Sequence, residues 1–597
     1  MQSLKPVDVV IVGGGWAGLT MARALTTRTG LEVVVLERGP ARKMADYSAD
    51  MDEVDYSIRM RLTQNAADET ITHRWTVRDQ AAPARVWGHV RIGDGTGGNG
   101  EHWTGVSNRY PADTFRLASA IKERFAAARI PRNLSVQDWP LTWEEIEPYY
   151  TQVEELLGIS GKAGNIRGKL IDGGNIFEGP RSKEYPVGPH VSTLSMSVFE
   201  KAARELGFHP YPAPAATLAR NYTNPDGVSR PGCAYCGYCG MYGCMIGAKA
   251  QPTSVLLPVL RRSRRFTLRN HCWARRIVHR GGHAEGVLYM DENGRETMQP
   301  ASLVILSSFT TGNVKLLLLS KIGELYDPET GRGTLGKNFC HQMAGGGGGM
   351  LIYKEPLHGF MSAGGQEMYF SDFDGFNHLD EDAGIVRGGT FTGGGGGGHP
   401  IQSFGGVPAG EAPRNWGSQW KKAALRYHDH IGSAPGFSAE HLAYSHNFYD
   451  LDTTWTDKWG DPLLRTTVDW TEHELRMRAF ALKISTRMGQ EMARVSGARL
   501  VSGGRGGRGA GRAGRRYQTA FYATTHLHGG AIMGDNPSSS VVNTYLQHWK
   551  VPNLFVAGGS AFPQAGTTNP TMTLLAITLR SADALIGRYL KRPGSLV

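Results

Sequence analysis

The sequence predicts a mixed α/β (α+β) fold with two or more domains. Its 597 residues exceed what one hydrophobic core usually holds, and a content of 40% apolar and 20% charged residues is typical of a globular protein. An apolar, β-branched run at Val9–Val12 comes before a glycine-rich turn, a helical pattern and a second apolar run, which together indicate a parallel α/β unit. The aromatic stretches at 441–452 and 463–471 instead indicate an antiparallel sheet.

The N-terminal unit has the pattern of a dinucleotide-binding site. Its glycines stand in G-x-G-x-x-G spacing: Gly13, Gly15 and Gly18. Gly13 allows the tight turn, Gly15 lets the backbone approach a pyrophosphate, and Gly18 allows close packing of a helix predicted over about 16–28. Glu37 ends the second strand, where it can accept hydrogen bonds from a ribose hydroxyl. This context predicts a Rossmann-like domain with a bound dinucleotide.

Four of the six cysteines lie within twelve residues, in the spacing C-x2-C-x2-C-x4-C. They are Cys233, Cys236, Cys239 and Cys244. A disulfide framework is improbable, because cysteines this close cannot all pair without strain. The spacing is near that of bacterial iron–sulfur runs, although those have three residues before the fourth cysteine and then a proline. We expect an iron–sulfur cluster here, with a structural zinc site as the alternative.

The C-terminal part predicts a second contact with the dinucleotide. A short buried strand is followed by Gly559 and Ser560. Asn569 and Pro570 have the form of a helix start, with asparagine as N-cap and proline at the first helical position. The positive end of that helix, which continues through Thr571, would favour an anion such as a reduced flavin ring.

Charge and hydropathy limit the kinds of partner that the chain is expected to bind. The net charge is +11, but the basic residues are scattered apart from two arginine-rich patches and have no aromatic interleaving, so nucleic acid is not expected. No apolar signal core, twin arginine or run of about 18 apolar residues is visible. We therefore expect a chain that contacts a membrane only through partners, and that is either cytoplasmic or exported with a partner that carries the signal.

Sequence blocks at both ends and in the middle of the chain share one family pattern. They are GGGWAG with Glu37, GTGGNGEHWTGVSNR at 95–109, DWPLTWEEIEPYY at 138–150, THLHGGAIMGDNPSSSVVN at 525–543 and NLFVAGGSAFPQAGTTNPTMT at 553–573. Together they resemble the glucose–methanol–choline (GMC) oxidoreductase family. The cysteine run resembles the large flavoprotein subunit of sugar dehydrogenases of the gluconate 2-dehydrogenase type. Glycoside 3-dehydrogenases and, without the cysteines, pyranose oxidases are also similar.

The resemblance implies that the dinucleotide is FAD and that a histidine takes the hydroxyl proton of the substrate. His526, three residues before Gly529, matches the family's catalytic base, and a neutral imidazole suits that task. His528 shares a face with it on an extended segment and is the weaker candidate. Asn569 matches the second member of the catalytic pair. Its amide can hold the developing alkoxide.

The resemblance also implies how FAD is held. The residues expected to contact it, besides the three glycines and Glu37, are Arg38, Gly97, His102, Gly559, Ser560, Pro570 and Thr571. His102 aligns with the histidine that some relatives bond covalently to the flavin 8α-methyl carbon. Glu101 replaces the usual small hydroxyl residue before it. We expect covalent attachment, and the alternative is a histidine that only packs against the flavin edge.

The implied reaction oxidises a hydroxyl of a sugar, sugar acid or glycoside to a carbonyl, with electrons leaving through a three-iron (3Fe-4S) cluster to a cytochrome c subunit. Such a cluster needs three cysteines, so one of the four would be spare. A small subunit with the export signal would place the complex on the periplasmic side of the inner membrane. The rivals are an oxidase of the pyranose-oxidase type that uses oxygen, a lyase that never reduces its flavin, and a flavin-binding scaffold with a zinc module.

These placements predict a discontinuous FAD-binding domain over 1–345 and 526–597, with the cysteine loop at 231–250, and an inserted substrate domain over 346–525. Three glycine-rich patches read as flexible surface loops. They are Gly345–Gly349, Gly393–Gly398 and Gly503–Arg516.

Overall fold

The computed structural model describes most of the chain. The described residues are 2–48, 51–55, 62–83, 92–345, 348–379, 383–395, 401, 407–408, 410–501, 516–517 and 525–597. The patch Gly503–Arg516 lies outside them except for Arg516, and the patches Gly345–Gly349 and Gly393–Gly398 lie partly outside. The prediction of loops at these patches is therefore not tested.

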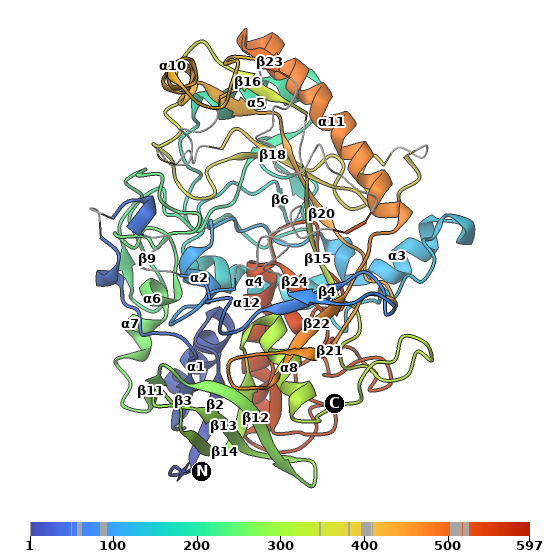
Figure 1. The fold of residues 1–597 in the computed structure, drawn as a ribbon. Coiled ribbons are helices and arrows are strands. Elements are labelled where there is room, and N and C mark those ends of the chain that lie inside the picture. Colours follow the sequence, from blue (N-terminus) through green and yellow to red (C-terminus); the bar gives the residue numbers. More distant parts are fainter. Residues whose placement is uncertain are drawn as a thin grey trace.

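A mixed eight-stranded sheet forms the lower part of the molecule (Figure 1). Its order is β11-β3-β2-β14-β13-β12, and β1 and β25 also pair with β14. The pairs from β11 to β14 and the β14–β25 pair are parallel, whereas β13 and β12 continue as antiparallel strands. The strands are β1 (Gln2–Ser3), β2 (Val7–Val12), β3 (Val33–Leu36), β11 (Phe266–Arg269), β12 (Trp273–Arg280), β13 (His283–Met290), β14 (Glu296–Leu306) and β25 (Leu554–Val556).

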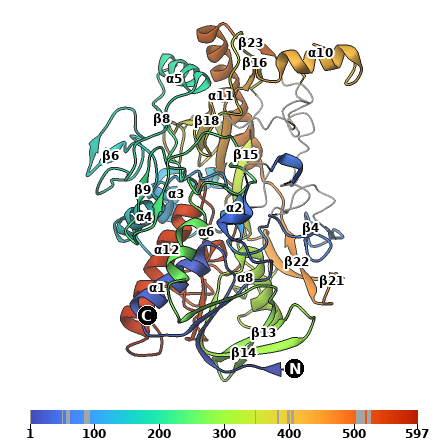
Figure 2. The same cartoon turned by 90° about the vertical axis from the view of Figure 1, so that its left-hand side faces the viewer.

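The N-terminal unit confirms the predicted dinucleotide-binding fold. Helix α1 (Trp16–Arg28) follows β2 over the residues that the sequence indicates. A Cβ atom on Gly18 would lie 2.1 Å from the carbonyl oxygen of Gly13, so only glycine lets the helix pack this closely. The C-terminal helix α12 (Thr571–Ala584) packs beside α1, as both views show (Figure 2).

A six-stranded antiparallel sheet forms much of the upper part, in the order β24-β15-β20-β18-β17-β8. Helices α5 and α11 pack over it and enclose a second core. These elements are β8 (Pro210–Pro212), β15 (Cys340–Gly345), β17 (Met368–Phe370), β18 (Gly389–Gly393), β20 (Gly436–Glu440), β24 (Leu527–His528), α5 (Leu194–Glu205) and α11 (Glu472–Ser496). The sheet takes strands from inside and outside 346–525, and the division into domains stays a proposal.

The two aromatic stretches form the antiparallel pair β21 (Phe448–Thr456) and β22 (Pro462–Thr467), as predicted. They belong to a separate sheet, in which β4 (Ile71–Arg74) lies parallel to β22 and pairs with β5 (Ala82–Pro83). The remaining strands are β6 (Asn165–Ile166), β7 (Lys169–Leu170), β9 (Tyr222–Thr223), β10 (Ser229–Arg230), β16 (Met350–Ile352), β19 (Ile431–Ser433) and β23 (Arg499–Val501).

The remaining helices are α2 (Asn99–His102), α3 (Leu117–Arg124), α4 (Trp143–Leu157), α6 (Pro252–Val255), α7 (Leu257–Leu260), α8 (Phe309–Leu319) and α10 (Ser418–Tyr427). In the described part of the chain, none of the helices has the length and apolarity that crossing a bilayer requires.

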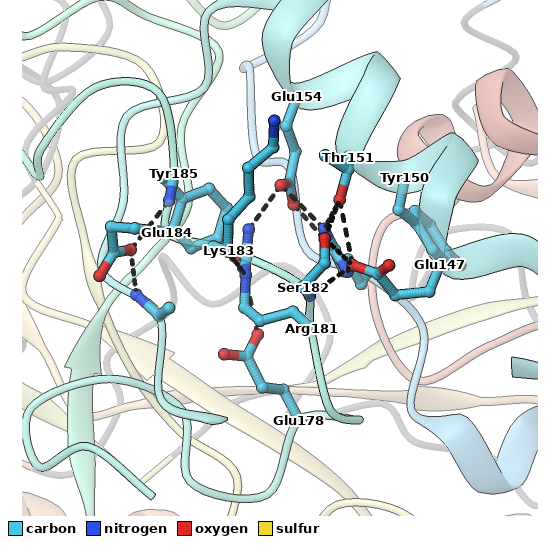
Figure 3. A network of polar contacts seen from close by, with 12 residues as sticks. Glu147, Tyr150, Thr151, Glu154, Glu178, Arg181, Ser182, Lys183, Glu184 and Tyr185 are labelled. Atoms are coloured by element: carbon cyan, nitrogen blue, oxygen red, sulfur yellow. Dashed lines mark hydrogen bonds and ion pairs between the residues drawn. The ribbon is translucent and has the colours of Figure 1, made fainter. Parts of the chain in front are cut away.

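A buried network of charges joins α4 to the loop around 178–185 (Figure 3). Arg109 donates to both carboxylate oxygens of Glu154, at 2.8 and 2.9 Å, and to Glu147 at 3.0 Å. Arg181 pairs with the same Glu154 from the other side. The hydroxyls of Tyr150 and Thr573 lie 2.6 Å apart, which ties α4 to α12.

Candidate active site

A cavity of about 450 Å³ opens between the eight-stranded sheet and the antiparallel sheet. The turn between β2 and α1 lines it, together with α2, α8, the 525–528 segment and the start of α12. Glu37 and β12 also line the cavity, as do His102, His526, His528 and Asn569. We call the part lined by these three histidines and Asn569 the flavin end.

The turn before α1 is built to hold an anion. Gly13 has φ +103°, and a Cβ atom there would lie 2.4 Å from the carbonyl oxygen of Ser307. The α1 N-terminus at Gly15 has no side-chain cap and no acidic residue in its first turn, so its N–H groups are left for a ligand. Glu37 holds the turn by accepting 2.8 Å hydrogen bonds from the backbone N–H groups of Gly14 and Gly39.

Sequence reasoning missed a chain of ion pairs among four residues that line the cavity. Arg38 pairs with Glu69 at 2.6 Å, Glu69 pairs with Lys315 at 2.6 Å, and Lys315 pairs with Asp457 at 2.7 Å. Glu69 precedes β4, Lys315 lies on α8 and Asp457 lies in the turn between β21 and β22, so only the fold brings them together. The one available signal was Lys315, a lysine inside an apolar helical run.

His526 directly precedes β24, and His528 is the last residue of that strand. His528 is 1% exposed, its ring stacks on Phe562 with centroids 4.9 Å apart, and neither ring nitrogen has a hydrogen-bond partner among the described residues. Burial lowers the pKa of His526 to about 4 and that of His528 to about 3. Both imidazoles are therefore neutral near pH 7, as a proton acceptor must be.

The prediction that Asn569 caps the last helix is wrong. The helix begins at Thr571 with Pro570 at the N-cap position, and no side chain caps it. The amide of Asn569 is used elsewhere, because its Oδ1 accepts a 3.5 Å hydrogen bond from Nε2 of Gln342 on β15. Asn569 thus lines the cavity as a polar group at the helix mouth.

His102 ends the short helix α2 and is buried against the cavity. Its backbone carbonyl accepts a 2.7 Å hydrogen bond from the N–H of Met241, which belongs to the cysteine loop. Glu101 is buried among other partners and accepts from Tyr47 at 2.6 Å and from Thr253 at 2.8 Å. Placing His102 beside the cavity is consistent with either covalent attachment or packing.

The cysteine loop lies directly beside the cavity, which Gly240 and Met241 help to line. Burial raises the pKa of Cys239 to about 12, and the charges of the other three cysteines of the run add to this shift. Backbone N–H groups donate to three of the sulfurs: Tyr235 to Cys233 at 3.3 Å, Gly364 to Cys239 at 3.1 Å and Lys249 to Cys244 at 3.4 Å.

Across the described residues, no three His, Cys, Asp or Glu side chains come close enough to share one metal ion. A single zinc ion needs such a group, whereas a cluster binds each cysteine through a different iron atom. The thiol donors and their N–H partners suit a cluster chemically. The cluster itself remains a prediction.

The predicted cofactor residues fall into two sets. Those that line the cavity are Gly13, Gly15, Glu37, Arg38, His102, Gly559, Pro570 and Thr571. Gly18, Gly97 and Ser560 support its wall: Gly97 donates to the carbonyl of Gly14 at 2.8 Å, and Ser560 accepts from Asn313 at 2.9 Å. An uncapped helix start, a buried acid and the unpartnered ring nitrogens of His528 along one cavity fit FAD.

Known proteins match along the whole chain. Residues 135–344 and 443–578 match models described as GMC oxidoreductase, and residues 8–130 match one described as FAD dependent oxidoreductase. The gluconate 2-dehydrogenase flavoprotein of Pantoea cypripedii is 39% identical over 100% of this chain and 96% of its own length. The fructose dehydrogenase large subunit of Gluconobacter japonicus is 24% identical over 97% of each chain.

Solved structures share the fold. Pyridoxine 4-oxidase from Mesorbium loti has a TM-score of 0.57 at 15% identity and covers 96% of this chain and 98% of its own. A formate oxidase from Aspergillus oryzae RIB40 has a TM-score of 0.58 at 14% identity over 99% of each chain. The predicted fold class and family are confirmed: the chain belongs to the GMC oxidoreductase family and is an FAD-dependent oxidoreductase that acts on CH–OH groups.

Proposed function

We propose that the protein is the flavoprotein subunit of a dehydrogenase that oxidises a hydroxyl of a sugar, sugar acid or glycoside to a carbonyl. The observation that carries this proposal is the flavin end of the cavity, where His526, His528 and Asn569 line one space. The full-length similarity to a gluconate 2-dehydrogenase flavoprotein supports a sugar acid as substrate, and that to a fructose dehydrogenase subunit supports a sugar.

His526 is the base in this proposal. When bound, FAD supplies the acceptor for the hydride of the carbinol carbon, which takes both electrons. The hydroxyl proton is left, and the neutral imidazole of His526 takes it. Because burial lowers the pKa of His526 to about 4, the ring carries no proton on its acceptor nitrogen at neutral pH.

Asn569 holds the substrate oxygen. Its Oδ1 accepts from Gln342, which leaves the amide N–H₂ group to donate to an oxygen in the cavity. A donor aimed at the position where negative charge develops stabilises the transition state. An amide does this without competing with His526 for the proton.

The cysteine loop is the electron exit. An iron–sulfur cluster held by Cys233, Cys236, Cys239 and Cys244, or by three of them, would supply one-electron transfer to a partner. The N–H donors to three sulfurs support this, since such bonds tune cluster potentials. The loop also contributes Gly240 and Met241 to the cavity wall, directly after Cys239 in the sequence.

The partners follow from this exit and from the relatives. We propose a cytochrome c subunit as electron acceptor and a small subunit that carries the export signal, with the complex on the periplasmic side of the inner membrane.

We also propose that His102 holds FAD covalently. Flavin fluorescence that stays with the denatured chain would support the bond, and its release would contradict it.

The decisive experiment is metal and sulfide analysis of protein purified without oxygen, followed by anaerobic titration with gluconate, glucose, fructose and glycosides. We expect about three iron atoms per chain and bleaching of the flavin absorbance by at least one of these substrates. One zinc ion with no iron would replace the cluster by a structural zinc module. Peroxide formed as fast as a dye is reduced would make the protein an oxidase, and a flavin that no hydroxyl compound bleaches would contradict the dehydrogenase altogether.

A further inference from the structure

One side chain joins the cysteine loop to the segment that carries His102. Lys249 is 0% exposed, and its Nζ lies within hydrogen-bond distance of four backbone carbonyls. These belong to Glu101 at 3.1 Å and to Trp103, Cys239 and Tyr242 at 2.8 Å each. Two of them flank His102, and the other two lie on the cysteine loop.

All four acceptors around Lys249 are backbone carbonyls, so its ammonium group connects two segments of backbone. Taking an ammonium group out of water costs several kcal/mol unless hydrogen bonds replace its hydration. Backbone carbonyls are fixed by the path of the chain, whereas a carboxylate on a flexible side chain could follow the lysine. A buried ammonium among four carbonyls of two segments therefore holds those segments at one spacing.

Neighbouring contacts repeat the same connection. The N–H of Met241 donates to the carbonyl of His102 at 2.7 Å. The side chain of Gln251 donates to Glu101 at 2.6 Å and accepts from the N–H of Cys244 at 2.8 Å. The part of the loop between Cys239 and Cys244 is thus bound to the His102 segment at several points, with Lys249 at the centre.

We propose that Lys249 is a positioning residue for electron exit, which holds the cysteine loop against the His102 segment and so fixes the separation between the flavin end of the cavity and the cysteines. The inference rests on the proposed function, because it assumes that the loop carries the electrons away. Electron transfer slows steeply with distance, so a loosened loop slows the exit. Hydride transfer takes place at His526 and Asn569, which Lys249 does not contact, and it is unaffected.

The test compares Lys249→Met with Arg230→Met in the holoprotein. Arg230 is a matched control because it is also buried, at 4% exposure, and binds the cysteine loop at the carbonyl of Ala248, and the carbonyl of Leu157, but nothing on the His102 segment. Three quantities are measured: flavin reduction by substrate without oxygen, reoxidation of the reduced protein by cytochrome c, and hydrogen exchange of the Met241 amide.

In Lys249→Met we expect unchanged flavin reduction, reoxidation slowed by about tenfold or more, and loss of protection of the Met241 amide. In Arg230→Met, reoxidation and the protection of Met241 stay at the wild-type level. Reoxidation at the wild-type rate in Lys249→Met, or equal losses in both variants, would overturn the proposal. If Lys249→Met does not fold, Lys249→Gln replaces it, with unchanged flavin reduction and with the same slowing of reoxidation and loss of Met241 protection expected at smaller size.

Failure of the proposed function gives a different result. A wild-type protein without iron would remove the exit at the cysteine loop, whatever Lys249 does. The Met241 amide would still report whether Lys249 holds the loop, because its exchange depends on the hydrogen bond to His102 and not on any redox group. If the wild-type protein contains iron but its Met241 amide exchanges without protection, the proposed role of Lys249 is contradicted and the proposed function is not.

Discussion

Two buried polar regions of this protein are built in opposite ways. In the network of Figure 3, Arg109 and Arg181 share the carboxylate of Glu154. At the flavin end of the cavity, His528 is equally buried, yet neither of its ring nitrogens has a partner among the described residues. Native proteins pair more than about 90% of their buried polar groups. The paired network therefore stabilises the fold, whereas the ring of His528 keeps its hydrogen-bonding capacity for a ligand.

The sharpest way to break this comparison is to remove the two histidines one at a time. His526→Ala should slow flavin reduction by substrate about a thousandfold, because a positioned base contributes about 10² to 10⁴ in rate. His528→Ala should slow it about tenfold, or about 1.4 kcal/mol, because that ring shapes the cavity rather than taking the proton. Rapid-mixing absorbance without oxygen measures both rates.

Equal FAD content and equal melting temperatures in the two variants are the control for this prediction. If His528→Ala is the slower variant, the base is His528 and the proposed role of His526 is wrong.

Substitutions in the charge network around Glu154 should change the free energy of unfolding rather than the rate of flavin reduction. Glu154→Gln leaves two buried guanidinium groups without their shared carboxylate, and breaking a buried ion pair in this way costs about 3 to 5 kcal/mol. Glu155→Gln is the matched control, since its pair with Lys183 is largely exposed and such pairs contribute about 1 kcal/mol or less. Denaturant unfolding measures both, and the KM of the folded Glu154→Gln protein should not change. Similar losses in both variants would mean that the network does not stabilise the fold.

The features predicted correctly from the sequence are those encoded by neighbouring residues. The G-x-G-x-x-G turn, α1 and the strand before Glu37 all lie within the first 40 residues, and Gly18 packs against Gly13 of the same turn. Gly13 also makes room for the distant carbonyl of Ser307. The cysteine spacing likewise placed four thiols on one loop. Family resemblance then placed His102, His526 and Asn569 on one cavity, which local patterns alone could not do.

What sequence reasoning missed depends on contacts between distant residues. Lys249 and Glu101 are 148 positions apart, and no periodic pattern marks either of them. The cap assigned to Asn569 was wrong because Gln342, 227 positions away, binds its amide. Helix-start patterns describe only the local competition for backbone N–H groups, and a tertiary hydrogen bond changed its outcome here.

The smallest expected effect tests whether the two regions are connected. The hydroxyl of Tyr150 on α4 lies 2.6 Å from that of Thr573, near the start of α12, where Thr571 lines the cavity. The preceding residue, Tyr149, donates to Asp583 at the far end of the same helix at 3.1 Å. Tyr149→Phe should lower the free energy of unfolding by about 1 kcal/mol, as loss of one hydrogen bond does. Tyr150→Phe should lower it by about 1 to 2 kcal/mol, because the Tyr150 hydroxyl also accepts a 3.4 Å bond from the N–H of Tyr110. Only Tyr150→Phe should also weaken FAD binding, because it frees the end of α12 that lines the cavity.

Fluorescence titration of apoprotein with FAD, or the flavin reduction potential if FAD is covalent, measures this effect on FAD binding. A change of the same size in both variants would mean that the network supports α12 as a whole and not the flavin end in particular.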